Sequence, residues 1–385
     1  MKYGDDMNRQ RKKEIIQLGQ YMNEKSLIKI PLINHIINSF DLLIDDQQLH
    51  YLLKLNNQKR SYEQLKELYD GDDFETFIHP LLHYGLIWCL HDEYELAPIF
   101  PGWIEICLSG PMDDKKMRVL NEFKNFEEFL KLVNLPGIRQ YLNYSHKKTL
   151  KNEPARMSTY VVPQDTVQIP IHKKIESKQE IILEGDVYQL LKDHPDEIAV
   201  MNCMCRLIKE TQNHQCEFDM PMRACLCVGS FSNQIMKYNV GEKISLEDAI
   251  ALVDECSKKG AVHTIYHYGM NSNNEEIAIC NCCKDCCFVY GSVQDGAISN
   301  IHIKAHYLSS IHNQKACIHC KQCLKYCPTD ALSFNKNEIT IDKSRCIGCG
   351  QCAKRCPKHI FEMIYGSRNV YVKTKGKRFY ENRFK

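Results

Sequence analysis

Apolar residues at helical spacing dominate the first 85 residues of the chain. Within residues 14–55 they recur at intervals of three and four, which is typical of helices with one buried face. Ser61 and Gln64 form the capping-box pattern that starts a helix. Residues 73–84 give a further helix, and Gly85 is placed to end it as a C-cap. The pattern therefore predicts a helical first part of the chain.

Two short stretches that follow these helices, residues 86–90 and 94–96, are typical of the strands of a small hairpin. Three helices and a hairpin of this size resemble a winged-helix domain, which here covers about residues 45–97. From residue 98 onward the pattern predicts further helix. We therefore expect a helical domain over residues 1–150 with a winged-helix-like part inside it.

The charges of the winged-helix-like part oppose a role in DNA binding, which many winged helices have. Residues 61–80 carry six carboxylates against Lys66 as the one lysine or arginine. Phosphate contact needs lysine and arginine on the helix that enters the groove, so this region would be repelled. Pro80 also predicts a kink or a break in the third helix. A structural or protein-docking role is favoured, and nucleic acid is not an expected partner.

The middle of the chain alternates strands and helix. Prolines at 154, 163 and 170 indicate an extended connector over residues 151–174. Short apolar strands at 199–202 and 277–279 both end in cysteine-rich loops. Ser245 is placed to cap a helix that runs to Lys259, and residues 261–267 are typical of another strand. We therefore expect an α/β domain over residues 175–298.

Length, charge and composition limit the classes of protein to which the chain can belong. With 385 residues the chain is long enough for two or three domains, and its net charge of +2 gives no global case for nucleic acid or an acidic surface. No apolar run approaches the roughly 18 residues of a membrane span, and the start lacks the apolar stretch of a signal peptide. Twenty-one cysteines in such a chain predict a cytoplasmic protein whose reduced thiols are free to bind metal.

The last eight cysteines form two copies of one motif. Residues 317–328 and 346–357 each read C-x2-C-x2-C-x3-C-P, and the copies start 29 residues apart. One loop can hold three iron corners of a cubane with three thiolates, and in a duplicated motif the fourth cysteine ligates the other cluster. The motif predicts two [4Fe–4S] clusters, one on Cys317, Cys320, Cys323 and Cys356 and one on Cys346, Cys349, Cys352 and Cys327. Zinc sites differ in using separated C-x2-C pairs.

This motif resembles the bacterial two-cluster ferredoxins over residues 300–365. The resemblance implies two short hairpins and two short helices around the clusters, with residues 340–342 as the strand that leads into the second loop. We expect a 2[4Fe–4S] ferredoxin-like domain over residues 299–365, followed by a basic tail over residues 366–385. A module of this kind transfers electrons, but its presence does not define the function of the whole protein.

The middle of the chain holds a second concentration of cysteines. Adjacent thiols such as Cys282 and Cys283 diverge, so only a subset of them can ligate one metal. Cys256 lies on the apolar face of the predicted helix and is expected to be packing. The leading hypothesis is a third Fe–S cluster, the main alternative is a zinc site, and redox or structural thiols are the remaining one. The candidate ligands are Cys203, Cys205, Cys216, Cys225, Cys280, Cys282, Cys283, Cys286 and Cys287.

The order of these parts along most of the chain resembles a family of 4Fe–4S ferredoxin-type proteins from anaerobes. The resemblance is carried by the helical first part, the Cys203-Met-Cys205-Arg strand end, the run from Cys280 to Cys287 and the two-cluster motif. Family members often carry a Cys-Cys-x-Cys-Cys-Cys ending, where this chain has Cys-Cys-Lys-Asp-Cys-Cys. The resemblance implies iron–sulfur binding and an anaerobic setting, and leaves the reaction open.

The sequence as a whole predicts an α+β multidomain protein that transfers single electrons to or from a redox partner protein. One alternative is an oxidoreductase whose active site is the middle cysteine cluster. Another is a redox-sensing regulator in which the winged-helix-like part responds to the clusters. The sequence contains no G-x-G-x-x-G after a strand, no P-loop and no H-E-x-x-H, so no short motif supports a nucleotide or metalloprotease site.

Overall fold

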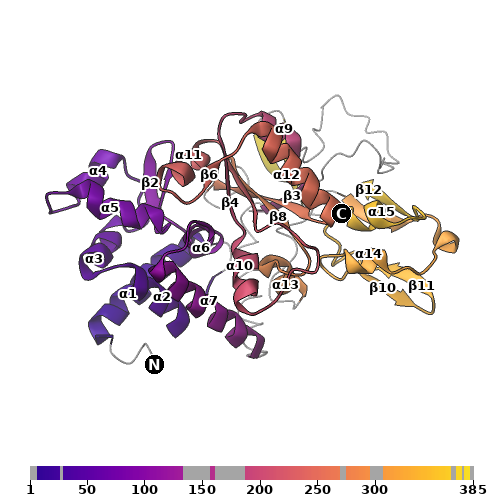
Figure 1. The fold of residues 1–385 in the computed structure, drawn as a ribbon, viewed down its shortest axis with the longest axis horizontal. Coiled ribbons are helices and arrows are strands. Elements are labelled where there is room, and N and C mark those ends of the chain that lie inside the picture. Colours follow the sequence, from indigo (N-terminus) through magenta and orange to yellow (C-terminus); the bar gives the residue numbers. More distant parts are fainter. Residues whose placement is uncertain are drawn as a thin grey trace. The chain divides into compact units, whose positions relative to one another are not determined.

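A computed structural model of the chain shows a fold of both helices and sheets (Figure 1). The residues that the structure describes are 7–26, 29–132, 157–160, 187–268, 275–294, 307–365, 370–374 and 377–381. The chain divides into two compact units. The first consists of residues 1–142, 197–215 and 227–244, and the second of residues 143–196, 216–226 and 245–385. Two segments of the stretch expected to form the middle domain thus belong to the first unit.

The first unit is mainly helical. Its helices are α1 (Arg9–Lys25), α2 (Asn34–Leu43), α3 (Asp46–Leu55), α4 (Tyr62–Glu67), α5 (Phe74–His83), η1 (Ile99–Trp103), α6 (Ile104–Ser109), α7 (Asp114–Leu132), α10 (Met204–Thr211) and α11 (Ser230–Lys237). Its strands are β1 (Ile87–Leu90), β2 (Glu93–Leu96), β4 (Ile198–Asn202) and β6 (Glu242–Lys243). The core includes Phe40, which stacks on Trp103 with ring centres 4.1 Å apart, and Phe123, which packs against the same indole.

The elements expected between residues 61 and 96 are present. Ser61 and Gln64 make both hydrogen bonds of the capping box at the start of α4. The strands β1 and β2 pair antiparallel as a hairpin. Pro80 lies inside α5 and does not break it, because the helix continues to His83. The element order therefore agrees with the expectation, while a winged-helix role stays a prediction.

A buried lysine in the first turn of α7 gives the first testable prediction. Lys116 is fully buried, and its Nζ has no hydrogen-bond partner among the described residues. Burial lowers the pKa of Lys116 below its ordinary value of 10.5. We expect Lys116→Met to raise the free energy of unfolding by about 1–3 kcal/mol, because it removes an amine that is costly to bury. Denaturant unfolding at neutral pH measures this.

The pH dependence supplies a second readout for Lys116. The folded protein binds this proton more weakly than the unfolded chain, so the wild type gains stability as the pH rises from the lowered pKa towards 10.5. The Lys116→Met variant lacks this gain, so its advantage shrinks at high pH. The exposed neighbour Lys115 is the control, and Lys115→Met is expected to change stability by less than about 1 kcal/mol. An equal response of both variants would contradict the prediction.

The second unit contains a sheet and the cysteine motifs. Its helices are α9 (Val187–Lys192), α12 (Leu246–Lys259), α13 (Phe288–Gln294), η4 (Gln314–Ala316), α14 (Gln322–Lys325) and α15 (Gln351–Arg355). Strands β3 (Met157–Tyr160), β7 (Val262–His267), β8 (Glu276–Cys282) and β5 (Arg223–Val228) are neighbours in that order, and the last two residues of β5 are assigned to the first unit. Ser245 caps α12 and Gly260 ends it, as expected from the sequence.

The segment after residue 306 is built from two-stranded sheets and short helices (Figure 1). Strand β10 (Leu332–Asn335) pairs antiparallel with β11 (Glu338–Ile341), and β9 (Tyr307–Ile311) pairs antiparallel with β12 (Phe361–Tyr365). The helices α14 and α15 each begin inside one copy of the cysteine motif. Within the expected basic tail, β13 (Val370–Thr374) and β14 (Lys377–Glu381) form a further hairpin.

Most of the expected connector over residues 151–174 lies outside the described residues. The described part of it, β3, pairs antiparallel with β7 and is therefore part of the sheet. The expected turn at residues 135–137 also lies outside the described residues. None of the described helices is long and apolar enough to cross a membrane.

Candidate metal centres

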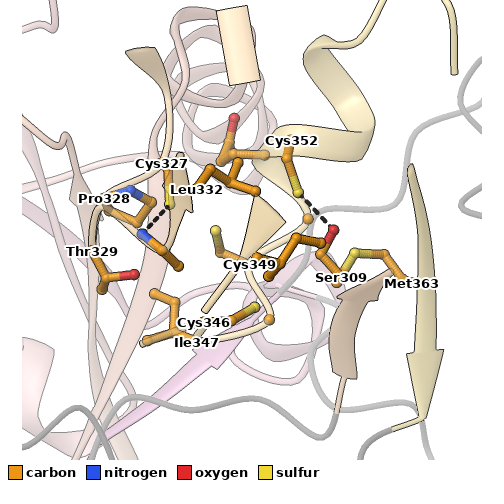
Figure 2. Close-up of a pocket in the computed structure, with 15 residues that line it drawn as sticks. Ser309, Cys327, Pro328, Thr329, Leu332, Cys346, Ile347, Cys349, Cys352 and Met363 are labelled. Carbon is orange, nitrogen blue, oxygen red and sulfur yellow. Dashed lines mark hydrogen bonds between the residues drawn. The ribbon is translucent and has the colours of Figure 1, made fainter. Parts of the chain in front are cut away.

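Four cysteines from both copies of the motif line one pocket (Figure 2). Cys346, Cys349 and Cys352 come from the second copy, and Cys327 is the last cysteine of the first copy. These are the four residues expected to hold the second cluster. Apolar groups that complete the pocket are Pro328, Ala331, Leu332, Ile341, Ile347 and Met363. The pocket thus offers four thiols inside an apolar wall, which is the donor set that an iron–sulfur cluster takes.

Local backbone geometry explains why the second motif can bring its thiols together. Gly348 and Gly350 have φ angles of +79° and +74°, a region that disfavours residues with a Cβ. They flank Cys349, so the chain can turn sharply on both sides of that residue. Gly350 also precedes the first residue of α15, whose first turn carries Cys352. The loop and the helix together direct the thiols to one pocket.

Burial and repulsion between neighbouring thiolates disfavour the ionised form of these thiols and so raise their pKa values. Burial raises the pKa of Cys349 well above its ordinary value, and the neighbouring thiols, Cys327 first, raise it further. Burial also raises the pKa of Cys352 to about 12, against a lowering effect of Ser309, whose Oγ lies 3.1 Å from Cys352 Sγ. The amide of Ala331 donates to Cys327 Sγ over 3.2 Å. Cations in the pocket would relieve the repulsion among the thiolates.

The other four cysteines of the motif also gather, but closer to solvent. Cys323 is buried, and its pKa is raised to about 12, first by burial and then by the charges of Cys356, Cys320 and Cys317. Cys320 is exposed, whereas Cys317 and Cys356 are half-buried. These are the four residues expected to hold the first cluster. The two sets therefore differ in exposure, with the first set facing solvent through Cys320.

A comparison with known protein families identifies the segment that contains these eight cysteines. Residues 316–360 match the 4Fe-4S dicluster domain. The chain carries a ferredoxin-type iron–sulfur module. This match confirms the expected module and its 4Fe–4S chemistry, while the ligand role of each cysteine stays a prediction. No curated protein and no solved structure matches the chain.

Three of the nine candidate ligands in the middle of the chain lie close together in the second unit. The Sγ atoms of Cys216, Cys283 and Cys286 are all within 4.8 Å of one another, and Cys216 Sγ is 3.8 Å from Cys283 Sγ. The pKa of Cys216 is lowered, mainly by hydrogen bonds from Cys283 and Cys286 and further by the amides of Met220 and Phe218. Hydrogen bonding with Cys216 and Cys283, and then burial, raise the pKa of Cys286. We call Cys216, Cys283 and Cys286 the thiol triad.

A second group of middle thiols lies on neighbouring strands. Cys225 on β5 has its Sγ 3.8 Å from that of Cys280 on β8. Hydrogen bonding with Cys225 and with Cys282 raises the pKa of Cys280 well above its ordinary value. Cys282 and Cys287 both influence the charge state of the buried Tyr290, as does Cys349 of the ferredoxin-type module. The charges of middle thiols and of one module thiol thus both raise the pKa of Tyr290.

The remaining candidate ligands and histidines are placed differently. Cys203 and Cys205 belong to the first unit, at the start of α10. Cys256 is fully buried among apolar groups of the second unit, which confirms its expected packing role. His263 is buried with its Nδ1 2.6 Å from Asn281 Oδ1, and burial lowers its pKa to about 4. Such a histidine is an interior polar residue in this structure.

Several residues near these sites belong to no motif, so the sequence alone did not identify them. Ser309 reaches Cys352 only because β9 pairs with β12, so its role depends on tertiary structure. Lys284 lies between two triad cysteines and donates to the Leu324 carbonyl over 3.1 Å and to Asp330 Oδ1 over 2.6 Å. Both acceptors belong to the ferredoxin-type module. The loop that carries Cys283 and Cys286 is therefore hydrogen-bonded directly to the module through Lys284.

Proposed function

We propose that the protein transfers single electrons between a redox partner protein and two [4Fe–4S] clusters in its ferredoxin-type module. The observation that carries the proposal is the pocket formed by Cys327, Cys346, Cys349 and Cys352, inside the segment that matches a 4Fe-4S dicluster domain. Cys317, Cys320, Cys323 and Cys356 would hold the other cluster. A bound cluster supplies a centre that accepts and releases one electron at a time.

The exposure of Cys320 supports an assignment of roles to the two sites. The first set of cysteines approaches the surface, so it would exchange electrons with the partner. The second set lines an enclosed pocket, and the module that contains it is hydrogen-bonded to the loop of the thiol triad through Lys284, so it would pass electrons inward. A cytoplasmic location and an anaerobic setting are part of the proposal, because reducing conditions preserve thiolate-bound clusters.

A further metal centre among the middle cysteines belongs to the proposal, as a third Fe–S cluster or a zinc site. The clustering of the thiol triad beside the module favours such a centre, and with it the second candidate function, an oxidoreductase. A redox-sensing regulator would need to contact DNA. The acidic residues of α4 and α5 and their flanks oppose that contact, so the regulator is not our proposal.

Anaerobically purified protein tests the proposed function. We expect about eight irons and eight sulfides per chain from the module, and one reduced-cluster EPR signal from each of two interacting centres. Reduced protein should also pass its electrons to an added one-electron acceptor such as cytochrome c. A chain that binds fewer than about four irons under these conditions, or that binds iron without being reducible, would refute the proposal.

Ser309 provides a matched test of how the chain tunes the enclosed centre. A hydrogen bond to a ligand sulfur stabilises the more negative, reduced state of a cluster. If the bond contributes about 0.5–1.5 kcal/mol, Ser309→Ala should lower one reduction potential by about 20–60 mV. Anaerobic redox titration followed by EPR measures the shift. Ser310→Ala, on the same strand, is the control, and a comparable shift in both variants would contradict the assignment.

A further inference from the structure

The spacing of the thiol triad suits one metal ion. In a tetrahedral zinc–thiolate site the metal–sulfur distance is about 2.3 Å, which places two ligand sulfurs about 3.8 Å apart. Cys216 Sγ and Cys283 Sγ are 3.8 Å apart, and Cys286 Sγ lies within 4.8 Å of both. We propose that Cys216, Cys283 and Cys286 bind a single soft divalent ion, with Zn²⁺ as its reference, and not a third cubane.

The ferredoxin-type module provides an internal comparison for this spacing. In a cubane each thiolate binds a different iron and points outward from its corner, so the sulfurs stand farther apart than on one ion. Among the described residues, no three cysteines of the module have their sulfurs within 4.8 Å of one another. The triad meets that criterion. One chain thus shows two spacings, a wide one in the module and a narrow one in the triad.

Backbone turns hold the triad cysteines in place. Cys283 and Cys286 are the ends of a C-x2-C turn in which the amide of Cys286 donates to Cys283 Sγ over 3.4 Å. Cys216 starts another turn, closed by the amide of Asp219 on the Cys216 carbonyl at 3.1 Å. The amides of Phe218 and Met220 bond to Cys216 Sγ. Amides that donate to thiolate sulfur are the outer contacts that orient metal ligands.

Contacts outside the sulfurs join the two turns of the triad. The amide of Glu217 donates to Asp285 Oδ2 over 2.8 Å, which links the turn after Cys216 to the C-x2-C turn. Lys259 Nζ donates to the Asp219 carbonyl over 2.6 Å, which ties the first turn to the end of α12. The ligand geometry is thus formed by the fold itself. A preformed site binds an ion without the entropic cost of ordering two loops.

The surroundings of the triad distinguish a metal site from three packed thiols. Cys283 and Cys286 are 1% and 3% exposed, in an apolar cluster that includes Phe218 and Met220. The half-buried Asp285 has its Oδ2 3.5 Å from Cys286 Sγ, so a carboxylate adjoins the sulfurs at the edge of this apolar cluster. A cation compensates both thiolates and carboxylate. Three thiolates leave one tetrahedral position, which a water or Asp285 would fill.

Metal analysis of the anaerobically purified full chain tests the single-ion site. We expect about eight irons and eight sulfides plus one further ion, which is either one zinc or one iron without added sulfide. Cys216→Ser, Cys283→Ser and Cys286→Ser should each reduce that further ion at least tenfold and retain the eight irons. Cys256→Ser removes a thiol from the same apolar cluster and is the matched control, expected to retain the ion.

Spectroscopy keeps the test valid if a variant fails to fold. Wild-type protein in which Co²⁺ replaces the single ion should show the intense visible absorption of tetrahedral cobalt–thiolate. About twelve irons and twelve sulfides per chain would overturn the proposal in favour of a third cubane. A wild-type chain with neither a further ion nor a cobalt–thiolate spectrum would also overturn it. The eight irons of the module are counted separately, so failure here is distinguishable from failure of the electron-transfer proposal.

Discussion

A Cys327→Ala variant is expected to lose about four of the roughly eight irons, and the lost cluster is the one bound by the second copy of the motif. The physical reason is that Cys327 lines the same pocket as Cys346, Cys349 and Cys352. Cys349→Ala should therefore produce the same loss. Iron analysis and EPR of anaerobically purified variants measure the number and identity of the remaining clusters.

Double variants decide whether the ligands are crossed between the two copies. Cys327→Ala with Cys349→Ala should lose no more iron than either single variant, because both changes affect one cluster. Cys327→Ala with Cys317→Ala should lose both clusters. The opposite pattern, in which Cys327 and Cys317 act together, would mean that each copy holds its own cluster. Cys89→Ala, in the hairpin strand β1, is the control and should retain all iron.

A Gly260→Ala variant is expected to destabilise the contact between α12 and the ferredoxin-type module by about 2–5 kcal/mol. Gly260 has a φ of +104°, and a Cβ there would lie 2.4 Å from the Tyr326 ring. The backbone conformation costs about 1–2 kcal/mol for a residue with a side chain, and overpacking against the ring adds about 1–3 kcal/mol. Native-state hydrogen exchange of amides in α14 and β10 measures the loss.

Gly291→Ala is the matched control for this prediction. Gly291 lies in α13 of the same unit, and a Cβ at that position would meet no atom within 4 Å. Alanine is the better helix former, so we expect this variant to gain up to about 1 kcal/mol. If both glycine variants change the exchange rates alike, the contact between Gly260 and Tyr326 does not stabilise the module.

Local sequence signals predicted a large part of the secondary structure. The capping box of α4 and the serine N-cap and glycine C-cap of α12 depend on neighbouring residues alone, so these helix ends could be predicted from the sequence. The cysteines of the module are likewise a local pattern. Three cysteines separated by two residues each place their thiols in one loop, whatever surrounds that loop. Pro80 was expected to kink or break α5. It does not break the helix, which continues to His83 with buried residues on both sides of Pro80.

The features that the sequence could not predict depend on contacts between residues that lie far apart in the chain. Cys216 meets Cys283 across 67 residues, and the contact depends on how two turns and α12 pack. Nine candidate ligands therefore remained together in the sequence interpretation, although three of them form a triad and others lie on β5 and β8. The membership of residues 197–215 and 227–244 in the first compact unit has the same origin, because strand and helix contacts decide it.

The unequal exposure of the two cysteine sets has a consequence for the lifetime of the protein in air. Cys320 is open to solvent, whereas Cys327, Cys346 and Cys352 are buried. Small oxidants reach an exposed thiolate first and convert it stepwise to oxidised sulfur acids. Decay would therefore begin at the outer site and leave a half-loaded chain as a discrete intermediate. The enclosed centre would outlive the outer one, which is the site that we propose exchanges electrons with the partner.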